Sequence, residues 1–281
     1  MPAVFLKDRS LLLVSGAEAQ SFLQNLITTD ITALEPDEAR PGALLTPQGK
    51  ILFDFMIWQD GEGFVIETDA DQRDGLLKRL TMYKLRAAVT LAPSPEEGVT
   101  VSWGEDADGS QGVRDSRFAK AGVTLIRRPG KHGDGAQALY DALRISHGIV
   151  TSGSDFALQD AFPHDVLMDF NGGLSFRKGC YVGQEVVSRM QHRGTARRRV
   201  VTVSAIAALP GTGTEITAAG KPVGTLGSVE GDHGLAIVRI DRAGAAMAAG
   251  TPLLAGEIPV SLVLPAWSGL AFPTSADEAS A

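Results

Sequence analysis

Apolar residues in the first ninety positions recur first at strand spacing and then at helical spacing. A short apolar run over residues 10–16 predicts a strand, and Pro47-Gln48-Gly49-Lys50 separates two apolar stretches as the turn of a hairpin. Leu76 and Leu80 lie at helical spacing after Asp69, which predicts a helix that Asp69 caps. The order hairpin, strand, helix, strand favours an antiparallel sheet with helices on one face, an α+β arrangement.

The regular spacing of apolar residues becomes less clear in the middle of the chain. Residues 93–115 are rich in Gly, Pro, Ser and acids, which predicts a surface connection with one strand-like piece at 99–103. Helical spacing over residues 136–147 predicts a helix that Gly148 ends. Residues 152–177 show almost no period and predict a long irregular loop, a kind of segment that is usually functional or disordered.

After Arg199 short strands follow one another at regular spacing, with glycines between them. This pattern predicts a small all-β barrel or sandwich and a domain boundary near Arg199. The last residues, 273–281, are small and polar, which predicts a disordered end.

Composition narrows the class of protein. The 281-residue chain is 44% hydrophobic and 21% charged, as in ordinary globular proteins, and no segment approaches the ~20 apolar residues of a membrane span. The formal net charge of -7 argues against direct nucleic-acid binding by the molecule as a whole. A single cysteine excludes an internal disulfide, a closed zinc site of several thiolates and a four-cysteine iron–sulfur cluster. We therefore expect a reducing, cytoplasmic environment.

That cysteine, Cys180, lies in the run Lys178-Gly179-Cys180-Tyr181-Val182-Gly183-Gln184-Glu185, just before a predicted short helix. The helix N-terminus and the ammonium of Lys178 would both favour a thiolate, although a lone cysteine can equally be a small buried apolar residue. Glu185 in the first helical turn can be a ligand group or simply a partner of the helix dipole.

A basic run over residues 189–199 stands out against the acidic whole. It can bind RNA phosphates, a polyglutamate tail or acidic surface of its own chain, and the lack of interleaved aromatic residues disfavours single-stranded nucleic acid. Asp160, Asp165 and Asp169 with His164 match no metal-site spacing, so we interpret them as loop residues and predict no metal site.

The run from Lys178 to Glu185 resembles the signature of the YgfZ family of folate-binding proteins, within the glycine-cleavage T-protein superfamily, whose mitochondrial counterpart is an assembly factor for [4Fe-4S] proteins. Other segments fall in the family's order: residues 22–30, 47–50, 83–86, 144–149 and 189–194. The resemblance implies an α+β, three-domain T-protein-like arrangement, with two α+β domains around a central channel and a C-terminal antiparallel β-barrel. The implied domains are 1–45 with 130–198 (carrying the signature), 46–129, and 199–272.

The resemblance also implies a cofactor, tetrahydrofolate or a folate derivative. Catalytic roles would fall to Cys180, Lys178 and Asp54. Arginine suits the carboxylates of a folate tail because its donors form a planar fork. The implied folate-contacting residues are Arg144, Tyr83, Arg86, Tyr181, Gln184, Glu185 and Arg189.

Two departures from the T-protein pattern count against aminomethyl transfer. The acidic pair of the T-protein falls on Phe53-Asp54, so one carboxylate is replaced, and Ser146 stands where the T-protein has a pterin-contacting glutamate. Losing a positioned acid typically lowers a rate by ~100-fold or more.

We therefore expect a folate-binding accessory factor for the assembly or repair of [4Fe-4S] proteins, tRNA-modifying enzymes among them. Its partners would be folate and, transiently, iron–sulfur enzymes or assembly proteins, without a membrane. A folate-dependent aminomethyltransferase, or another one-carbon transferase or demethylase with Asp54 as its acid, is the alternative. A scaffold that uses folate only for folding is the third possibility.

Overall fold

The computed structural model describes residues 2–104, 107 and 109–273. All but the first residue of the predicted disordered end therefore lies outside the described residues. The chain folds into two compact units: the first comprises Met1–Tyr140 and Asn171–Gln184, and the second comprises Asp141–Phe170 and Glu185–Ala281.

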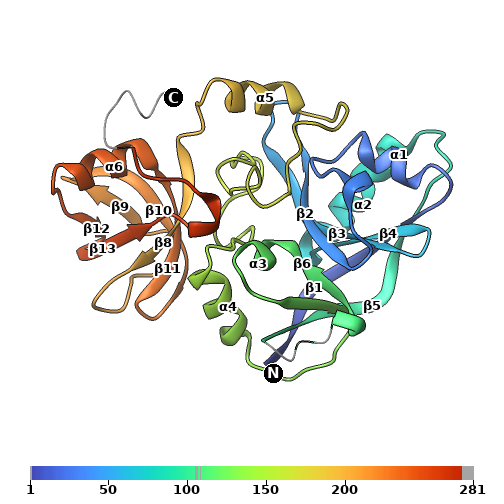
Figure 1. Cartoon of the computed structure of the whole chain (residues 1–281), viewed down its shortest axis with the longest axis horizontal. Coiled ribbons are helices and arrows are strands. Elements are labelled where there is room, and N and C mark those ends of the chain that lie inside the picture. The colour runs from blue at the N-terminus through green and yellow to red at the C-terminus, as the bar shows by residue number, and fades with distance from the viewer. Residues whose placement is uncertain (1, 105–106, 108, 274–281) are drawn as a thin grey trace. The chain divides into compact units, whose positions relative to one another are not determined.

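In the first unit, strands close into a barrel in the order β1-β4-β3-β2-β6-β7-β5 (Figure 1). Their bounds are β1 (Ala3–Ser15), β2 (Glu38–Leu45), β3 (Ile51–Asp60), β4 (Gly63–Asp69), β5 (Thr90–Trp103), β6 (Val113–Asp115) and β7 (Leu125–Pro129). Neighbours pair antiparallel, except that β2 and β6 run parallel. Closure gives every strand of this sheet a neighbour on both sides, although β2 pairs with β6 only at Glu38 and Ala39.

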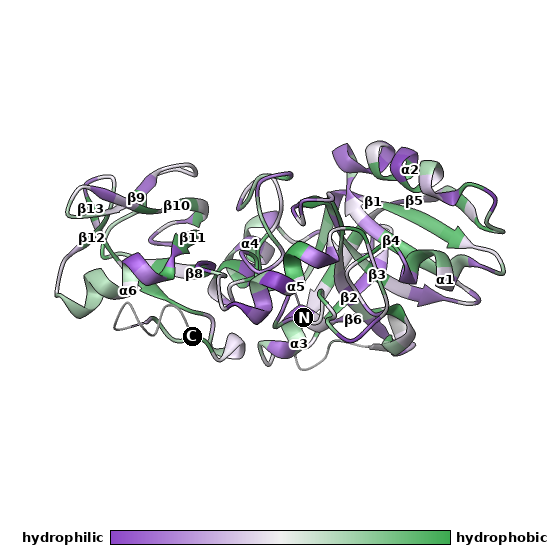
Figure 2. Ribbon diagram, turned by 90° about the horizontal axis from the view of Figure 1, so that it is seen from above, coloured by the Kyte–Doolittle hydropathy of each residue, from purple (hydrophilic) through white to green (hydrophobic). Residues whose placement is uncertain are grey.

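Local sequence explains the hairpin and the main helix. The turn after β2 is closed by a hydrogen bond from Thr46 N to Lys50 O, at 2.8 Å. Helix α2 (Ala70–Lys84) begins at the predicted cap, where the Asp69 carboxylate accepts from Asp71 N at 3.0 Å. Figure 2 shows α2 as largely hydrophilic, while its Leu76 and Leu80 side chains are fully buried in the hydrophobic core that α1 and α2 share with the strands.

Strand β5 differs from the sequence prediction. Its fourteen residues continue through Pro93 and Pro95, where we expected a surface connection. It pairs with β1, and the register shifts twice, between Leu6 and Ser10 and between Ser10 and Leu12. Because prolines cannot donate to the ladder, irregular pairing of this kind is where a strand can accommodate them.

The barrel also mixes ranges that the sequence prediction assigned to different domains. Residues 3–15 were placed with the first α+β domain and residues 46–129 with the second, yet β1 pairs with both β4 and β5. The boundaries of the two units thus differ from the predicted ones, because these pairings join strands far apart in sequence.

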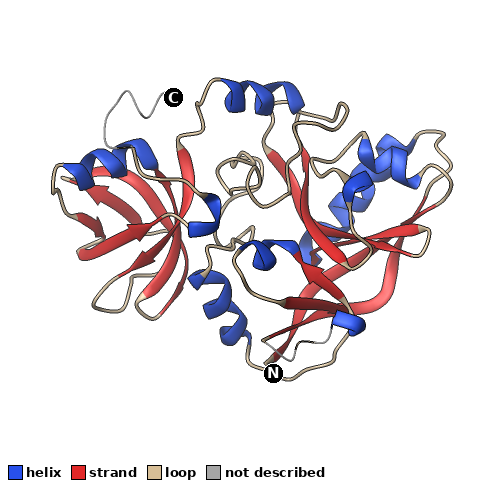
Figure 3. Ribbon diagram, in the orientation of Figure 1, coloured by secondary structure: helices blue, strands red, loops and turns tan. Residues whose placement is uncertain are grey.

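Short elements complete the first unit: α1 (Ala19–Gln24), the 3-10 turns η1 (Ile31–Ala33) and η2 (Gly109–Gln111), and α3 (Ser116–Lys120). Helices α4 (Gln137–Ser146) and α5 (Gln184–His192) each include the boundary between the units. The predicted irregular loop is present, since Figure 3 shows no helix or strand between α4 and α5. Gly148, with a φ of 71°, follows α4 as predicted.

The second unit contains a closed antiparallel barrel in the order β10-β11-β8-β13-β12-β9. Its strands are β8 (Arg198–Ser204), β9 (Glu215–Ala218), β10 (Lys221–Glu230), β11 (His233–Arg239), β12 (Leu253–Ala255) and β13 (Ile258–Val263). Helix α6 (Ile240–Ala248), which the sequence pattern did not reveal, packs Ile240 and Ala243 onto the barrel core, and η3 (Ala266–Ser268) follows β13. No helix in the described part of the chain is long and apolar enough to span a bilayer.

Candidate functional site

The cysteine loop, residues 171–184, is fixed to the first unit by hydrogen bonds near the end of α1. The Thr28 hydroxyl donates to Gly173 O at 2.6 Å, and Ser175 N donates to Thr28 O at 3.0 Å. Both the Thr28 side chain and Gly173 are buried, so these bonds form away from competing water. The start of the loop is therefore held in a defined place on the first unit.

Lys178 is the second anchor of the cysteine loop. Its side chain is buried, and Nζ donates to Ile27 O at 2.7 Å and to Thr29 O at 2.8 Å. Nζ also lies 5.5 Å from the centre of the Tyr181 ring, a favourable cation–π position. Burial lowers the pKa of Lys178 to about 8. The ammonium thus serves to hold the loop; its predicted action on the Cys180 thiolate stays a prediction.

Cys180 itself is exposed, so its thiol is presented to solvent rather than packed in a core. Helix α5 begins four residues later, at Gln184, in line with the sequence prediction of a helix after the cysteine. Beside it, burial raises the pKa of Tyr181 to about 12, and the Tyr181 hydroxyl finds no hydrogen-bond partner in the described chain. The loop therefore combines a buried Lys–Tyr pair with an accessible thiol.

Gly183 brings the hairpin turn against the same loop. Its φ is 80°, and a Cβ at this position would lie 2.5 Å from Thr46 O and 3.1 Å from the Gly49 Cα. Only glycine fits this approach without a shift of the backbone. Three of the segments that carry the family resemblance, residues 22–30, 47–50 and 178–185, thus meet in the first unit.

Asp54 lies on β3 and is half-buried. Gln72 Nε2 donates to its Oδ1 at 3.4 Å, and the Thr68 hydroxyl donates to its backbone oxygen at 3.0 Å. Phe53, in the place of the missing acid, packs against the barrel core and lies against Gly75 of α2. The position that an acid would need is therefore an apolar one here.

The other implied folate residues of the first unit are spread out. Tyr83 is half-buried against the barrel core, Arg86 is exposed just beyond α2, and Gln184 is half-buried at the start of α5. No hydrogen bond in the described structure joins any of them to Cys180 or Asp54. The structure thus places these residues in the same unit without linking them into one polar cluster.

Arg144 belongs to the second unit, where its guanidinium is hydrogen-bonded to other side chains of that unit. It donates to Asp155 at 2.7 Å, to Asp141 at 2.7 Å and to the Ser228 hydroxyl at 2.5 Å. Its side chain is 6% exposed. Ser146, two residues on, is exposed and bonds to Leu143 O at 2.8 Å. These contacts give Arg144 a structural role that ties α4 to the following loop and to β10.

The exposed side chains of Glu185 and Arg189, one turn apart on α5, pair with each other at 2.6 Å. An exposed pair four residues apart on a helix contributes little to stability, about 0.3–0.5 kcal/mol. Two further arginines of the basic run that contains Arg189 are paired with acids of the second unit. Arg198 pairs with Asp160 at 3.2 Å, and Arg199 pairs with Asp169 at 2.9 Å.

Asp160 and Asp169, which lie in the long loop, therefore serve as ion-pair partners of arginines in the same chain. Arg198 also approaches Asp165 at 3.7 Å. In the part of the chain that the structure describes, no group of three or more His, Cys, Asp or Glu side chains is arranged to hold a metal ion.

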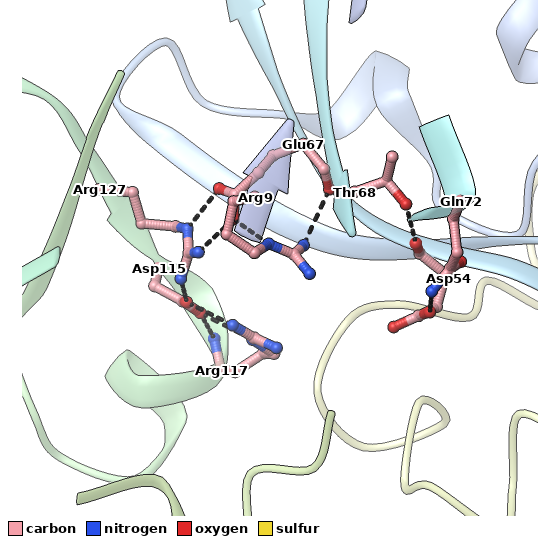
Figure 4. Close-up of polar contacts among 8 residues, drawn as sticks. All are labelled: Arg9, Asp54, Glu67, Thr68, Gln72, Asp115, Arg117 and Arg127. Atoms are coloured by element: carbon pink, nitrogen blue, oxygen red, sulfur yellow. Dashed lines mark hydrogen bonds and ion pairs between the residues drawn. The ribbon is translucent and has the colours of Figure 1, made fainter. Parts of the chain in front are cut away.

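The sequence analysis did not predict one buried cluster of charged side chains, which is centred on Glu67 and Arg127. Inside the first barrel, the Arg127 side chain bonds to Glu67 and, at 2.9 Å, to Asp115 (Figure 4). Arg9 reaches the same glutamate at 2.7 Å, and Arg117 donates to both oxygens of Asp115. Although burial opposes ionisation of Glu67, the charges of Arg127 and Arg9 outweigh it and hold its pKa at about 2.

A signal for this cluster exists in the sequence. Glu67 and Arg127 each interrupt an otherwise apolar strand, Phe64–Ile66 and Leu125–Ile126, at a position where alternation does not explain a charge. Two opposite charges of this kind inside one barrel indicate a buried ion pair, but the sequence does not show that β4 and β7 belong to the same barrel.

The overall arrangement can be compared with solved structures. Aminomethyltransferase T of the glycine cleavage system from Bartonella henselae superposes with a TM-score of 0.67, covering 94% of this chain and 85% of its own, at 17% sequence identity. The protein thus has the fold of that transferase, with mixed α/β content and a C-terminal closed antiparallel barrel. At this identity the likeness shows the fold alone.

Sequence relatives are more specific. Residues 197–270 match the family model described as the CAF17 C-terminal beta-barrel domain. The human iron-sulfur cluster assembly factor IBA57 is 30% identical over 272 residues, covering 83% of this chain and 76% of its own, and a homolog from Pyricularia oryzae is 34% identical over 220 residues. The chain belongs to the IBA57 family. It spans about half the length, 55%, of the Pyricularia oryzae homolog.

Proposed function

We propose that this protein is an accessory factor for the assembly or repair of iron–sulfur proteins and that Cys180 is its working thiol. The observation that carries the proposal is an exposed Cys180 on a loop anchored by the buried Lys178, in a chain whose relatives are named iron-sulfur cluster assembly factors. Thiolates are the ligands that iron–sulfur clusters use, and a reactive thiol must be accessible.

One cysteine cannot hold a cluster alone, because a [4Fe-4S] cluster takes four ligands. Cys180 therefore works with ligands of a partner, an iron–sulfur enzyme or an assembly protein, with the cluster as cargo. The fixed loop limits the freedom of the thiol, which lowers the entropy cost of a short-lived shared complex. We include tRNA-modifying enzymes among the proposed clients.

Substitution of Cys180 tests this role. Cys180→Ala should reduce the activity of a [4Fe-4S] enzyme in cells that lack the wild-type gene, whereas the purified variant should melt as the wild type does, because the side chain is exposed. Cys180→Ser, which keeps size and polarity, should fail in the same way. Full [4Fe-4S] enzyme activity with both variants would refute the role of the thiol.

A folate is the second part of the proposal, and the described residues suit it unequally. Asp54 fits the N–H edge of a pterin, because it is half-buried and its described side-chain bond, from Gln72, is long and uses one oxygen only. Arg86 is exposed and suits a carboxylate of the glutamate tail. Arg144 does not fit, because its donors are taken by Asp155 and neighbouring groups.

Calorimetry with tetrahydrofolate on the full chain tests this part. Binding should stabilise the protein by an amount that grows with ligand concentration. Asp54→Asn and Arg86→Gln should each weaken binding by about tenfold or more, the value of a hydrogen bond to a charged group. Arg73→Gln, at a partly buried arginine on α2 that pairs with Asp74, serves as the control and should bind as the wild type. No saturable binding would remove folate from the proposal.

Aminomethyl or other one-carbon transfer is the alternative, supported by the half-buried Asp54 in a chain with a transferase fold. It requires turnover of a methylated amine with tetrahydrofolate that Asp54→Asn abolishes. Folate-dependent stabilisation without turnover, together with an active Cys180→Ala variant, would instead favour a scaffold. A cytoplasmic location also stays a prediction; the relatives' names place those proteins in mitochondria.

A further inference from the structure

The second unit contains a cavity of about 290 Å³, lined by residues of that unit. Its lining includes the polar residues Gln191, Arg197, Arg199 and Asp241, and the other lining residues are mainly apolar. Small-molecule sites combine an apolar wall with a few converging polar groups in this way, and this volume lies at the small end of their range.

Arg199 is the unusual member of the lining. Its side chain is 7% exposed, and its bonds inside the described chain all leave from Nη1: to His164 O at 2.6 Å and to both oxygens of Asp169 at 3.0 and 2.9 Å. The Nε–H is closed to solvent and has no partner among the described residues, so a ligand in the cavity cannot reach it. The donor of Arg199 that remains for a ligand is Nη2, which makes no hydrogen bond within the described chain.

Arg197 supplies a second, more loosely held guanidinium. It is 46% exposed, and it reaches the Asp241 carboxylate only at 4.0 Å, the limit for an ion pair. Asp241 is instead held by Arg239, at 2.9 and 2.6 Å. Arg197 is therefore free to turn towards another anion.

The charges around the cavity favour an anion. Among the described residues that line the cavity are two arginines, Arg197 and Arg199, and one carboxylate, that of Asp241. His164 adds no charge near neutral pH, since burial, together with the nearby Arg199, lowers its pKa to about 4. A local positive excess within a chain of net charge -7 marks this cavity as a place where an anion would be attracted.

The remaining wall limits what the anion can be. Met190, Ile240 and Leu270 line the cavity, so a bare inorganic ion would leave this apolar surface uncovered. We propose that the cavity binds a small organic monocarboxylate, with its carboxylate between Arg197 and Arg199 and a short apolar body against Met190, Ile240 and Leu270. The site is independent of the proposed work of Cys180.

Calorimetry of the full chain with benzoate and with 3-methylbutanoate tests the site. At least one of these probes should bind saturably at one site, while benzamide, which has the same shape without the charge, and inorganic phosphate, which lacks an apolar body, should each bind about tenfold more weakly or worse. Equal binding of benzamide, tighter binding of phosphate, or no saturable heat with either carboxylate would overturn the proposal.

Matched arginine variants locate the site. Arg197→Gln should weaken binding of the carboxylate by about tenfold or more, and since Arg197 is partly exposed the fold should remain intact. Arg198→Gln removes the same charge from the next residue, which pairs with Asp160 and does not line the cavity, and should bind as the wild type. Unchanged binding by Arg197→Gln, or an equal loss with Arg198→Gln, would refute the assignment.

Discussion

At the scale of single residues, neighbours in the cysteine loop have different roles: one residue anchors the loop and another is exposed to solvent. The Lys178 side chain is buried, and its ammonium donates hydrogen bonds to two backbone carbonyls. Cys180, two residues later, is exposed to solvent. The sequence identified both residues, because the octapeptide that holds them is distinctive. It did not reveal that Lys178 is buried, since its partners Ile27 and Thr29 lie about 150 residues away.

Lys178→Met should destabilise the protein at pH 7 by about 1–3 kcal/mol, because two hydrogen bonds to a charged donor are lost. The loss should depend on pH. The folded pKa of about 8 lies below the usual 10.5, so the unfolded chain binds more protons between these values and wild-type stability rises with pH there. Urea unfolding of both proteins between pH 7 and 10.5 measures this; a stability difference that is constant across that range would contradict it.

At the scale of elements, local signals were readable and long-range pairings were not. The hairpin turn and the Asp69-capped helix follow from residues close in sequence, and both are present. The course of β5 and the closure of the first barrel depend on β1, up to about 100 residues away. The Glu67–Arg127 pair, 60 residues apart, belongs to the same class of long-range contact.

Glu67→Gln tests how much the buried Glu67–Arg127 cluster contributes to the free energy of unfolding. It leaves Arg127 and Arg9 without their common carboxylate inside the barrel, which should cost about 3–5 kcal/mol of unfolding free energy. Glu62→Gln, an exposed acid in the turn between β3 and β4, should change stability by less than about 0.5 kcal/mol. Urea unfolding at pH 7 compares them.

The same pair predicts an acid response. The folded pKa of Glu67, about 2, lies below its usual 4.5, so its contribution is complete above pH 4.5 and is lost as the pH falls from 4.5 towards 2. The wild type should lose stability more steeply than Glu67→Gln in this window. Equal slopes for the two proteins would show that the cluster does not behave as an ion pair.

At the scale of the whole molecule, charge is arranged in locally matched groups within an acidic chain. From sequence alone, the basic run of residues 189–199 could bind RNA phosphates, a polyglutamate tail or acidic surface of its own chain. The structure shows acids of its own chain beside much of it: Asp160 at Arg198, Asp169 at Arg199 and, within α5, Glu185 at Arg189. Because the sequence cannot show which carboxylates fold back onto a basic run, this outcome was not predictable from its spacing.

This matching argues against direct RNA binding, whose affinity depends on arginines and lysines free to replace counterions. With a net charge of -7, the protein should show no saturable binding to a labelled single-stranded RNA tighter than about 10⁻⁴ M at physiological salt, measured by fluorescence anisotropy. Asp160→Asn, which removes one of the two carboxylates beside Arg198, should strengthen binding only at low salt, where the change of one charge is poorly screened. Micromolar binding by the wild type at physiological salt would show that the basic run reaches RNA despite its acidic partners, and any action on tRNA-modifying clients would then have to include the RNA itself.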